Sequence, residues 1–571
     1  MIRAGIDNRW IRFRCSKFHG AEHDLDSLVD HLYDDMESKV EASLTMFWMS
    51  LDIERLGAMA SHESALGAFA RVLREEGRKN FHLRSNAVST FWIFSHFHNF
   101  HQLLIENQIG RATLILLDLE SMRMQKQPAV TDLKALGSNV AKGEKILSLG
   151  LNENEPALEE QERFLYMSIS LLYHIAEDPQ IERRMCKYNL VEHLCEVLNR
   201  ANACLLTIAM AFLKRLSLYI ENLNPMRENG IMLKLSNFLH TENESLLSDT
   251  LQILHNLSFD RRFREDMVDS GFLQSFRSLL QKRKFEDMVT NILYNLSRDF
   301  DLRLRFAESE LLSIVMEPLI TENNMSVSEE LGALIINLTY NPKVAMLNLK
   351  ALEMEKFVSF VLGNNSLLLY KAMKNMSYIK GAGRLLQPYV PAFVVCLLRC
   401  EPSFQVELME ILNNLACLDE PWNDFMLNTN LLNYLTTHLQ VSNNEDDIIL
   451  QLIIFIGQIC SETSAPVLSQ SGLVKNLCDV FLDRTDDIDI ALQSLYAIYC
   501  FLLHDATRES FFQHFEKMVY HIVKLSQDFE KGVWTMAEFV LDAICEFEDS
   551  KGNFIKSLRF NTYNTGWEGT F

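Results

Sequence analysis

Apolar side chains recur every three or four positions along most of the chain, which is the spacing of one face of an α-helix. The clearest stretch, residues 248–280, predicts three helices in succession. Their apolar faces are built from Leu251, Leu254, Leu257, Phe263, Met267, Val268 and the segment 272–280. Gly271 stands before the third helix, where a left-handed residue suits a steep turn between two helices.

This pattern returns along the chain. A polar residue followed by Leu, Ile or Met and then a small residue, or a close variant of this, recurs every 38 to 44 residues. It falls at His174, Arg215, Asn256, Asn295, Asn337, Asn375, Asn414, Gln458 and Tyr499. Trp48 and Ile93 mark the same position earlier, and Ala543 marks it once later. A period of this length with three helices per unit is typical of armadillo repeats. The sequence therefore predicts an all-α, armadillo-repeat right-handed superhelical solenoid.

The repeat pattern also suggests domain boundaries. We expect a basic N-terminal tail over 1–22, a first group of repeats over 23–121 and the main solenoid over 162–549. Between the two groups, residues 122–161 contain prolines, glycines and an acidic run, as expected for an insert. Ile93 lies two periods before His174, and the insert between them is expected to be a loop that projects from the solenoid. Residues 550–571 lose the helical pattern and are expected to cap the solenoid or to extend from it.

Charge narrows the range of partners. With 54 basic and 76 acidic residues the net charge is −22, so the field repels nucleic acid and favours basic protein segments. The 11 cysteines are scattered, as in a reduced intracellular protein. No apolar run reaches the roughly 18–20 residues that cross a membrane, and direct membrane insertion is not expected.

Catalytic and metal-binding motifs are missing from the pattern. Neither a GxxxxGK[ST] phosphate loop nor a GxSxG turn occurs. His96, His98 and His101 are close in sequence, but on a helix only His98 and His101 could share a metal ion, and no nearby carboxylate or cysteine completes a ligand set. We therefore expect no catalytic residue, no metal site and no cofactor.

The asparagines at the repeat position form the candidate binding site. We call the repeated polar position the ladder position; its asparagines are Asn256, Asn295, Asn337, Asn375 and Asn414, and Gln252 and Asn291 lie one helical turn before two of them. An amide can donate and accept at once, which suits the main chain of an extended peptide in a groove. The alternative is that each asparagine merely ties neighbouring loops or helix ends together, as is typical of the repeat itself.

Several longer segments resemble the kinesin-associated protein family, the non-motor accessory subunit of heterotrimeric kinesin-II. They include LYDDMESKVEAS from Leu32, FSHFHNFHQLLIENQIG from Phe94, ILHNLSFDRRFREDMV from Ile253 and IFIGQICSETSAPVLSQSGLV from Ile454. The resemblance runs in order from about Asp24 to the C-terminus. Two departures are a shorter region before the first repeat and an abbreviated insert between the early repeats.

The resemblance implies a non-enzymatic adaptor. It would bind the tails of the two different kinesin-II motor chains and cargo adaptor proteins for microtubule-based transport, including intraflagellar transport. The implied place is the cytoplasm, on microtubules, with the cilium or axoneme as a further setting. The alternative is an armadillo scaffold that binds extended peptides at cell junctions or in nuclear transport. Positions one turn before the ladder asparagines lack the tryptophan array of an importin-alpha-like receptor, and the lysine ladder of a beta-catenin-like groove is also missing.

Overall fold

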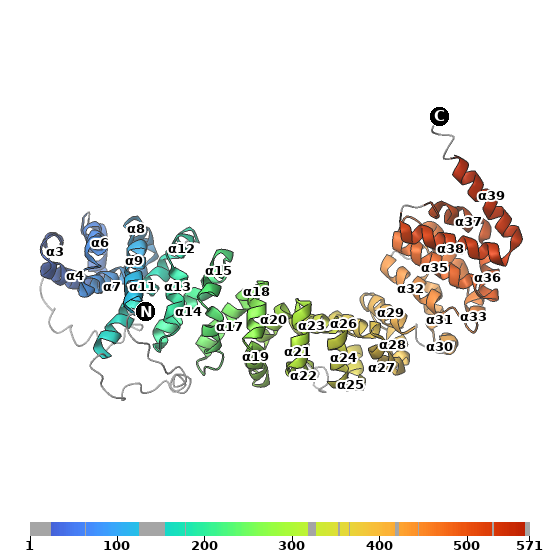
Figure 1. The fold of residues 1–571 in the computed structure, drawn as a ribbon, viewed down its shortest axis with the longest axis horizontal. Helices are drawn as coiled ribbons and strands as arrows, with labels where there is room; N and C mark the ends of the chain where they lie inside the picture. The colour runs from blue at the N-terminus through green and yellow to red at the C-terminus, as the bar shows by residue number, and fades with distance from the viewer. Residues whose placement is uncertain are drawn as a thin grey trace. The chain divides into compact units, whose positions relative to one another are not determined.

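A computed structural model describes the chain over residues 24–62, 64–124, 155–177, 179–317, 327–351, 354–364, 366–416, 422–442, 445–527 and 530–565. The basic N-terminal tail and most of the insert over 122–161 lie outside the described residues. All elements within the described residues are helices. The expected all-α repeat solenoid is confirmed at the level of fold class (Figure 1).

The helices fall into two compact units, residues 1–275 and 276–571. Helix α19 (Phe272–Gln281) contains the boundary. The first unit contains α3 (Leu25–His31), α4 (Met36–Ser50), α5 (Ile53–Ser61), α6 (Ala65–Glu76), α7 (Phe81–Ser95), η2 (His98–Phe100), α8 (His101–Glu106), α9 (Ile109–Met124), α11 (Glu155–Ile175), α12 (Pro179–Cys186), α13 (Leu190–Val197), α14 (Ala203–Leu216), η3 (Ile220–Asn222), α15 (Leu223–Glu228), α16 (Ile231–Ser236), α17 (Glu244–Leu257) and α18 (Arg261–Asp269).

The second unit continues the same succession of short helices. It contains α20 (Glu286–Ser297), α21 (Phe300–Glu308), α22 (Leu311–Met316), α23 (Glu329–Thr339), α24 (Pro342–Ala351), α25 (Met354–Gly363), α26 (Leu367–Tyr378), α27 (Lys380–Leu386), η5 (Gln387–Tyr389), α28 (Val390–Leu397), α29 (Pro402–Ala416), α30 (Trp422–Asn428), α31 (Leu431–His438), α32 (Asp446–Ile459), α33 (Ala465–Gln470), α34 (Leu473–Asp483), α35 (Ile488–Leu502), α36 (Asp505–Phe512), α37 (Phe515–Leu525), α38 (Lys531–Phe547) and α39 (Asp549–Thr565).

The helices that carry the ladder position stack on one another within each unit. We call them ladder helices; they are α4, α7, α11, α14 and α17 in the first unit and α20, α23, α26, α29, α32, α35 and α38 in the second. Each contacts the next one in its unit. Leu251, Leu254 and Leu257 of α17 are fully buried, as the leucine spacing predicts. Burial of these faces between neighbours gives the stack a continuous apolar core.

Helices α7 and α11 pack directly on each other, although their ladder positions are two periods apart in sequence. They are therefore consecutive ladder helices. The second period of sequence between them contains the insert, and the described residues between them contain no further ladder helix.

A left-handed turn residue recurs before several third helices. Gly230, Gly271 and Gly472 have φ of 64°, 78° and 83°, as the sequence predicts. Gln108 and Asn189 take the same conformation, both at φ 57°, directly before α9 and α13. The left-handed turn therefore occurs in more repeats than the glycines indicate. Two repeats adopt it at a residue with a side chain, which strains the backbone there.

The C-terminal segment differs from expectation. Sequence periodicity indicates no helix after residue 549, but α39 spans Asp549–Thr565 and packs on α37 and α38. Ile555 is fully buried there, and the Arg559 guanidinium lies 2.6 Å from Glu538 Oε2 of α38. The helical pattern is weak because only one narrow stripe of α39 is covered, so tertiary packing rather than periodicity stabilises it.

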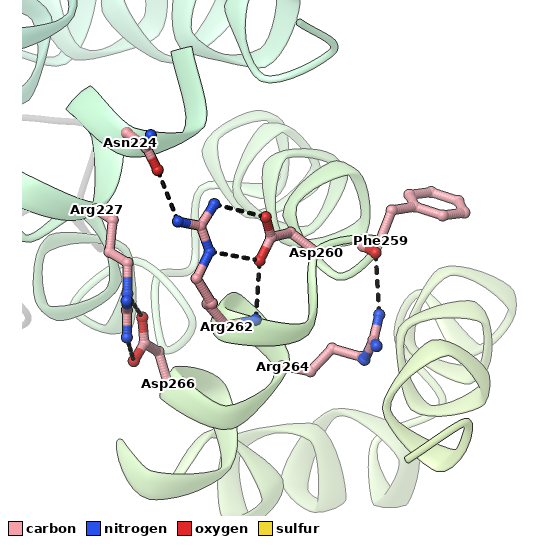
Figure 2. Close-up of polar contacts among 7 residues, drawn as sticks. All are labelled: Asn224, Arg227, Phe259, Asp260, Arg262, Arg264 and Asp266. Atoms are coloured by element: carbon pink, nitrogen blue, oxygen red, sulfur yellow. Dashed lines mark hydrogen bonds and ion pairs between the residues drawn. The ribbon is translucent and has the colours of Figure 1, made fainter. Parts of the chain in front are cut away.

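Exposed ion pairs also connect successive repeats. Figure 2 shows Arg227 of α15 in a two-bond pair with Asp266 of α18, at 2.7 and 2.9 Å. Arg262 pairs with Asp260 and donates to Asn224 Oδ1 at 2.8 Å. Paired guanidinium and carboxylate groups of this geometry orient neighbouring helices, although each exposed pair adds little to stability.

Among the described residues no single helix has the length and apolar character needed to cross a bilayer; Ala203–Leu216 and Ile220–Glu228 meet that test only as a pair, which is bent by 119°.

Candidate partner-binding surface

In the first unit the ladder side chains bond back to the preceding ladder helix. Asn256 Nδ2 donates to Ser217 Oγ at 2.8 Å and to the Lys214 carbonyl at 3.3 Å. His174 Nδ1 lies 2.9 Å from Ser95 Oγ, and Arg215 donates to the Tyr173 carbonyl at 3.1 Å. The ladder position therefore ties repeats together even where its residue type changes.

The second unit repeats the same contact with asparagine. Asn337 Nδ2 donates to Ser297 Oγ at 3.0 Å, and Asn414 Nδ2 donates to Ser377 Oγ at 2.9 Å. Asn375 Nδ2 donates to the Ile336 carbonyl at 3.3 Å. The serine hydroxyls donate their own protons to carbonyls within their helices, at 2.6 and 2.7 Å. Each serine oxygen can therefore only accept from the asparagine, which orients the amide.

The same geometry leaves one side of each amide open. In Asn256, Asn337, Asn375 and Asn414 the Oδ1 atom accepts no hydrogen bond from any described residue, and none of these atoms is a buried one without a partner. The four residues are half-buried. The sequence predicts an amide that donates to and accepts from a ligand. In the structure at least one N–H of each amide bonds between repeats, and each Oδ1 is left as an acceptor.

The other candidate residues are placed differently. Asn295 is only 3% exposed, so it offers little surface to a ligand. Gln252 and Asn291 are half-buried on α17 and α20, one turn before the ladder position. Neither makes a side-chain hydrogen bond to another described residue.

Exposed aromatic side chains accompany the ladder asparagines. Phe259, Tyr340 and Tyr378 follow Asn256, Asn337 and Asn375 by three residues and are 58%, 67% and 81% exposed. Tyr378 lies within α26, Tyr340 caps the end of α23, and Phe259 lies just beyond the end of α17, so all three stand at the C-terminal ends of ladder helices. The sequence carries this signal as NLSF, NLTY and NMSY, and it is missed when only the asparagine is followed. Large exposed aromatic side chains are typical anchors of protein interfaces.

Side chains of the next helix cap the end of several ladder helices. Arg264 donates to the Ser258 carbonyl at 3.0 Å, Arg303 to Ser297 at 2.6 Å and Arg508 to Leu502 at 2.8 Å. His101 occupies the equivalent place, with Nε2 2.7 Å from the Ser95 carbonyl. These groups satisfy carbonyls that a helix end leaves without a partner.

The expectation that no carboxylate completes a ligand set around His98 and His101 is wrong. Glu177 lies against both rings, with Oε2 3.4 Å from His98 Nδ1 and 3.5 Å from His101 Nδ1. It was missed because it is distant in sequence and approaches only when α11 packs on α8. His96 points elsewhere, with Nδ1 2.8 Å from the Trp92 carbonyl, as its helical position predicts.

Comparison with solved structures shows the fold. The chain resembles a structure described as "A conserved phosphorylation switch controls the interaction between cadherin and beta-catenin in vitro and in vivo", with a TM-score of 0.60 and 14% identity over 92% of this chain and 99% of that one. It also resembles an engineered protein, with a TM-score of 0.55 and 13% identity over 73% of this chain and 99% of that one. Likeness at this identity indicates shared architecture alone.

Comparison with protein families is more specific. The family model described as "Kinesin-associated protein (KAP)" matches residues 18–570, which is nearly the whole sequence. The match includes both units and all of the ladder helices described above. The chain belongs to the kinesin-associated protein family.

Proposed function

We propose that this chain is the adaptor subunit that binds the tails of the two kinesin-II motor chains and links the motor to cargo. Membership of the family makes it a kinesin-associated adaptor built on an armadillo-like scaffold, and both this and the all-α fold point to a non-enzymatic role. The finer assignment, to the paired tails and to cargo adaptor proteins, is supported by the surface chemistry of the ladder helices.

The observation that carries the proposal is the repeated pair of an open amide oxygen and an exposed aromatic side chain. In the second unit Asn337 is followed by Tyr340 and Asn375 by Tyr378, with the Oδ1 atoms unoccupied by other described residues. Two such pairs on consecutive ladder helices, α23 and α26, suit an extended segment, since the acceptors bind its N–H groups while the aromatic side chains cover its apolar positions.

The charge of the chain selects among extended segments. A surface of acceptors on a chain with a net charge of −22 favours ligands rich in donors and positive charge. A basic stretch in a motor tail would meet both conditions. Long-range attraction of this kind raises the association rate, and it weakens as salt is added because exposed charges are screened.

The proposed setting follows from the proposed partners. A chain that binds motor tails would act in the cytoplasm, in microtubule-based transport. Intraflagellar transport in the cilium is one such process. The cargo adaptor and the motor tails would occupy different repeats of the scaffold, so that both can be held at once.

Substitution of the exposed tyrosines tests the proposed surface. The double variant Tyr340→Ala/Tyr378→Ala removes two side chains that are mostly in solvent, so the fold should be unaffected. We expect the affinity for at least one motor tail, measured by calorimetric titration, to fall by roughly tenfold or more. Tyr520→Ala, a 54% exposed tyrosine on α37, is the control. Equal affinities in all three proteins would count against this surface.

A second comparison separates the ligand role of the asparagine from its role between repeats. Asn337→Ala removes both the Oδ1 acceptor and the bond to Ser297, whereas Ser297→Ala removes that bond and the serine's own bond to the Tyr294 carbonyl but leaves the Oδ1 acceptor in place. If the acceptor binds a tail, the first variant weakens binding and the second does not. If both variants weaken binding equally, Asn337 acts through the packing of repeats and the acceptor proposal fails.

A further inference from the structure

Three side chains from different elements meet at one end of the α7–α11 pair. Helix α7 ends at Ser95, and the chain then turns through η2, which begins at His98, into α8, which begins at His101. Glu177 follows the end of α11, and α11 packs on both α7 and α8. One ligand atom from each of His98, His101 and Glu177 lies within 4.8 Å of the others.

The hydrogen bonding of His101 determines which of its nitrogen atoms is free. Nε2 lies 2.7 Å from the Ser95 carbonyl, which can only accept, so Nε2 carries the proton. In the neutral ring the lone pair is then on Nδ1. That lone pair faces Glu177 Oε2 at 3.5 Å, and a carboxylate oxygen also has only lone pairs to offer. Two acceptors in this position are stabilised by a cation between them.

The distances fit a shared metal ion better than direct hydrogen bonds. Glu177 Oε2 is 3.4 Å from His98 Nδ1 and 3.5 Å from His101 Nδ1. Hydrogen bonds between nitrogen and oxygen fall at about 2.7–3.2 Å. Two ligands about 2.0–2.1 Å from a tetrahedral Zn²⁺ are separated by roughly 3.3–3.4 Å. That is close to the two distances from Glu177, and the ligand atoms of His98 and His101 lie within 4.8 Å of each other.

The hydrogen bond from His101 to the backbone holds its ring in the way that is usual for a histidine bound to a metal ion. A ligating histidine commonly donates its other ring N–H to a backbone carbonyl, as His101 does to Ser95. Ser95 is held in turn, because its hydroxyl donates to the Trp92 carbonyl at 2.7 Å and lies 2.9 Å from His174 Nδ1. The side chain of His101 is 11% exposed, while those of His98 and Glu177 are 85% and 55% exposed, which leaves a path for an ion from solvent.

We propose that His98, His101 and Glu177 form a binding site for a divalent transition-metal ion, with Zn²⁺ as the expected occupant. Two imidazole nitrogens and one carboxylate oxygen are a ligand set that Zn²⁺ accepts, whereas Mg²⁺ and Ca²⁺ prefer oxygen ligands throughout. Three protein ligands leave a fourth position for water or for a side chain of a bound protein. The site lies at the ends of the ladder helices α7 and α11 and includes none of the ladder asparagines.

Metal titration of the full chain tests the proposal. Zn²⁺ is titrated into wild type, His98→Ala, Glu177→Gln and His82→Ala in competition with a coloured chelator. His98 is chosen because it makes no structural hydrogen bond to a described residue, while Glu177→Gln keeps the shape and removes the charge. His82 is an exposed histidine at the other end of α7 and serves as the control. Co²⁺ provides a second probe, since four-coordinate Co²⁺ absorbs strongly in the visible range.

The expected result is one Zn²⁺ bound by wild type and by His82→Ala, with affinity reduced tenfold or more in His98→Ala and Glu177→Gln. The Co²⁺ absorption should be lost in the same two variants. Zn²⁺ binding that is the same in all four proteins, or absent from all four, would overturn the proposal. Circular dichroism of each variant confirms that the helices are retained.

Discussion

At the scale of single residues, two recurring contacts hold the helices together, one between neighbouring repeats and one within a repeat. A ladder side chain bonds back to the preceding ladder helix, as Asn256 does to Ser217, and a side chain of the following helix caps the carbonyls at the ladder helix end, as Arg264 does at Ser258. Each bond contributes about 1 kcal/mol, and a charged donor contributes somewhat more. Because the ladder bond recurs between neighbouring ladder helices, it helps to fix the spacing of the repeats.

At the left-handed turn residues, we expect two substitutions to change the free energy of unfolding in opposite directions. Gly271→Ala forces a side chain into φ 78°, and we expect a loss of about 1–2 kcal/mol in the free energy of unfolding, although a Cβ there meets no atom within 4 Å. Gln108→Gly relieves the same strain before α9 and should give a gain of up to about 1 kcal/mol. Urea unfolding measures both.

The matched control for this pair is Gly67→Ala. Gly67 lies inside α6 with an ordinary helical φ, and an added Cβ there also meets no atom within 4 Å. We expect this change to be neutral or stabilising by up to about 1 kcal/mol. A loss at Gly67 as large as at Gly271 would show that the turn conformation is not the cause.

His174 predicts a pH dependence. Burial, with smaller contributions from His96 and His101, lowers the pKa of His174 to about 4. The folded state therefore favours the neutral ring, and its contribution to stability is complete above the unfolded pKa of about 6.5 and is lost as the pH falls towards 4. Allowing for solvent screening at this half-buried position, we expect a loss of about 1–2 kcal/mol.

The variant His174→Asn isolates this effect. Asparagine keeps a donor for Ser95 Oγ, as at the other ladder positions, and does not titrate. Urea unfolding at pH 7.5 and 4.5, with a chelator present, should show wild type losing about 1–2 kcal/mol more than the variant. Parallel losses in the two proteins would show that another group titrates.

At the scale of elements, helices with strong periodicity were predictable from sequence and the others were not. The ladder helices follow because Leu251, Leu254 and Leu257 make a complete buried stripe on α17. Helix α39 was missed because few of its residues are covered, and Glu177 was missed because sequence spacing cannot show which loops meet in space. The ladder asparagines were predictable as a repeat, but their donor bonds to Ser297 and Ser377 needed coordinates.

The packing of α39 gives a prediction at the same scale. Ile555 is fully buried against the preceding helices, so Ile555→Ala should lower the free energy of unfolding by about 2–4 kcal/mol through the cavity it leaves. Ser557→Ala, an exposed position on α39, should change it by less than about 0.5 kcal/mol. Urea unfolding measures the free energy of unfolding of both variants. An equal change in the two would mean that α39 is not docked.

At the scale of the whole molecule, the repeats supply many similar contact points and the family supplies the partner class. The family match extends over residues 18–570, so the scaffold as a whole belongs to a kinesin-associated protein. A chain with a net charge of −22 that pairs an open amide oxygen with an exposed aromatic side chain at Asn256, Asn337 and Asn375 is suited to basic, extended segments. The adaptor role depends on such segments being present in both motor chains.

The most direct measurement is the stoichiometry of the purified chain with the tail segments of the two kinesin-II motor chains. Size-exclusion chromatography with light scattering should show one complex that contains one copy of each polypeptide, and added salt should weaken it because exposed charges contribute to association. Elution of the chain alone, in the presence of either tail and of both tails together at low salt, would contradict the proposed function.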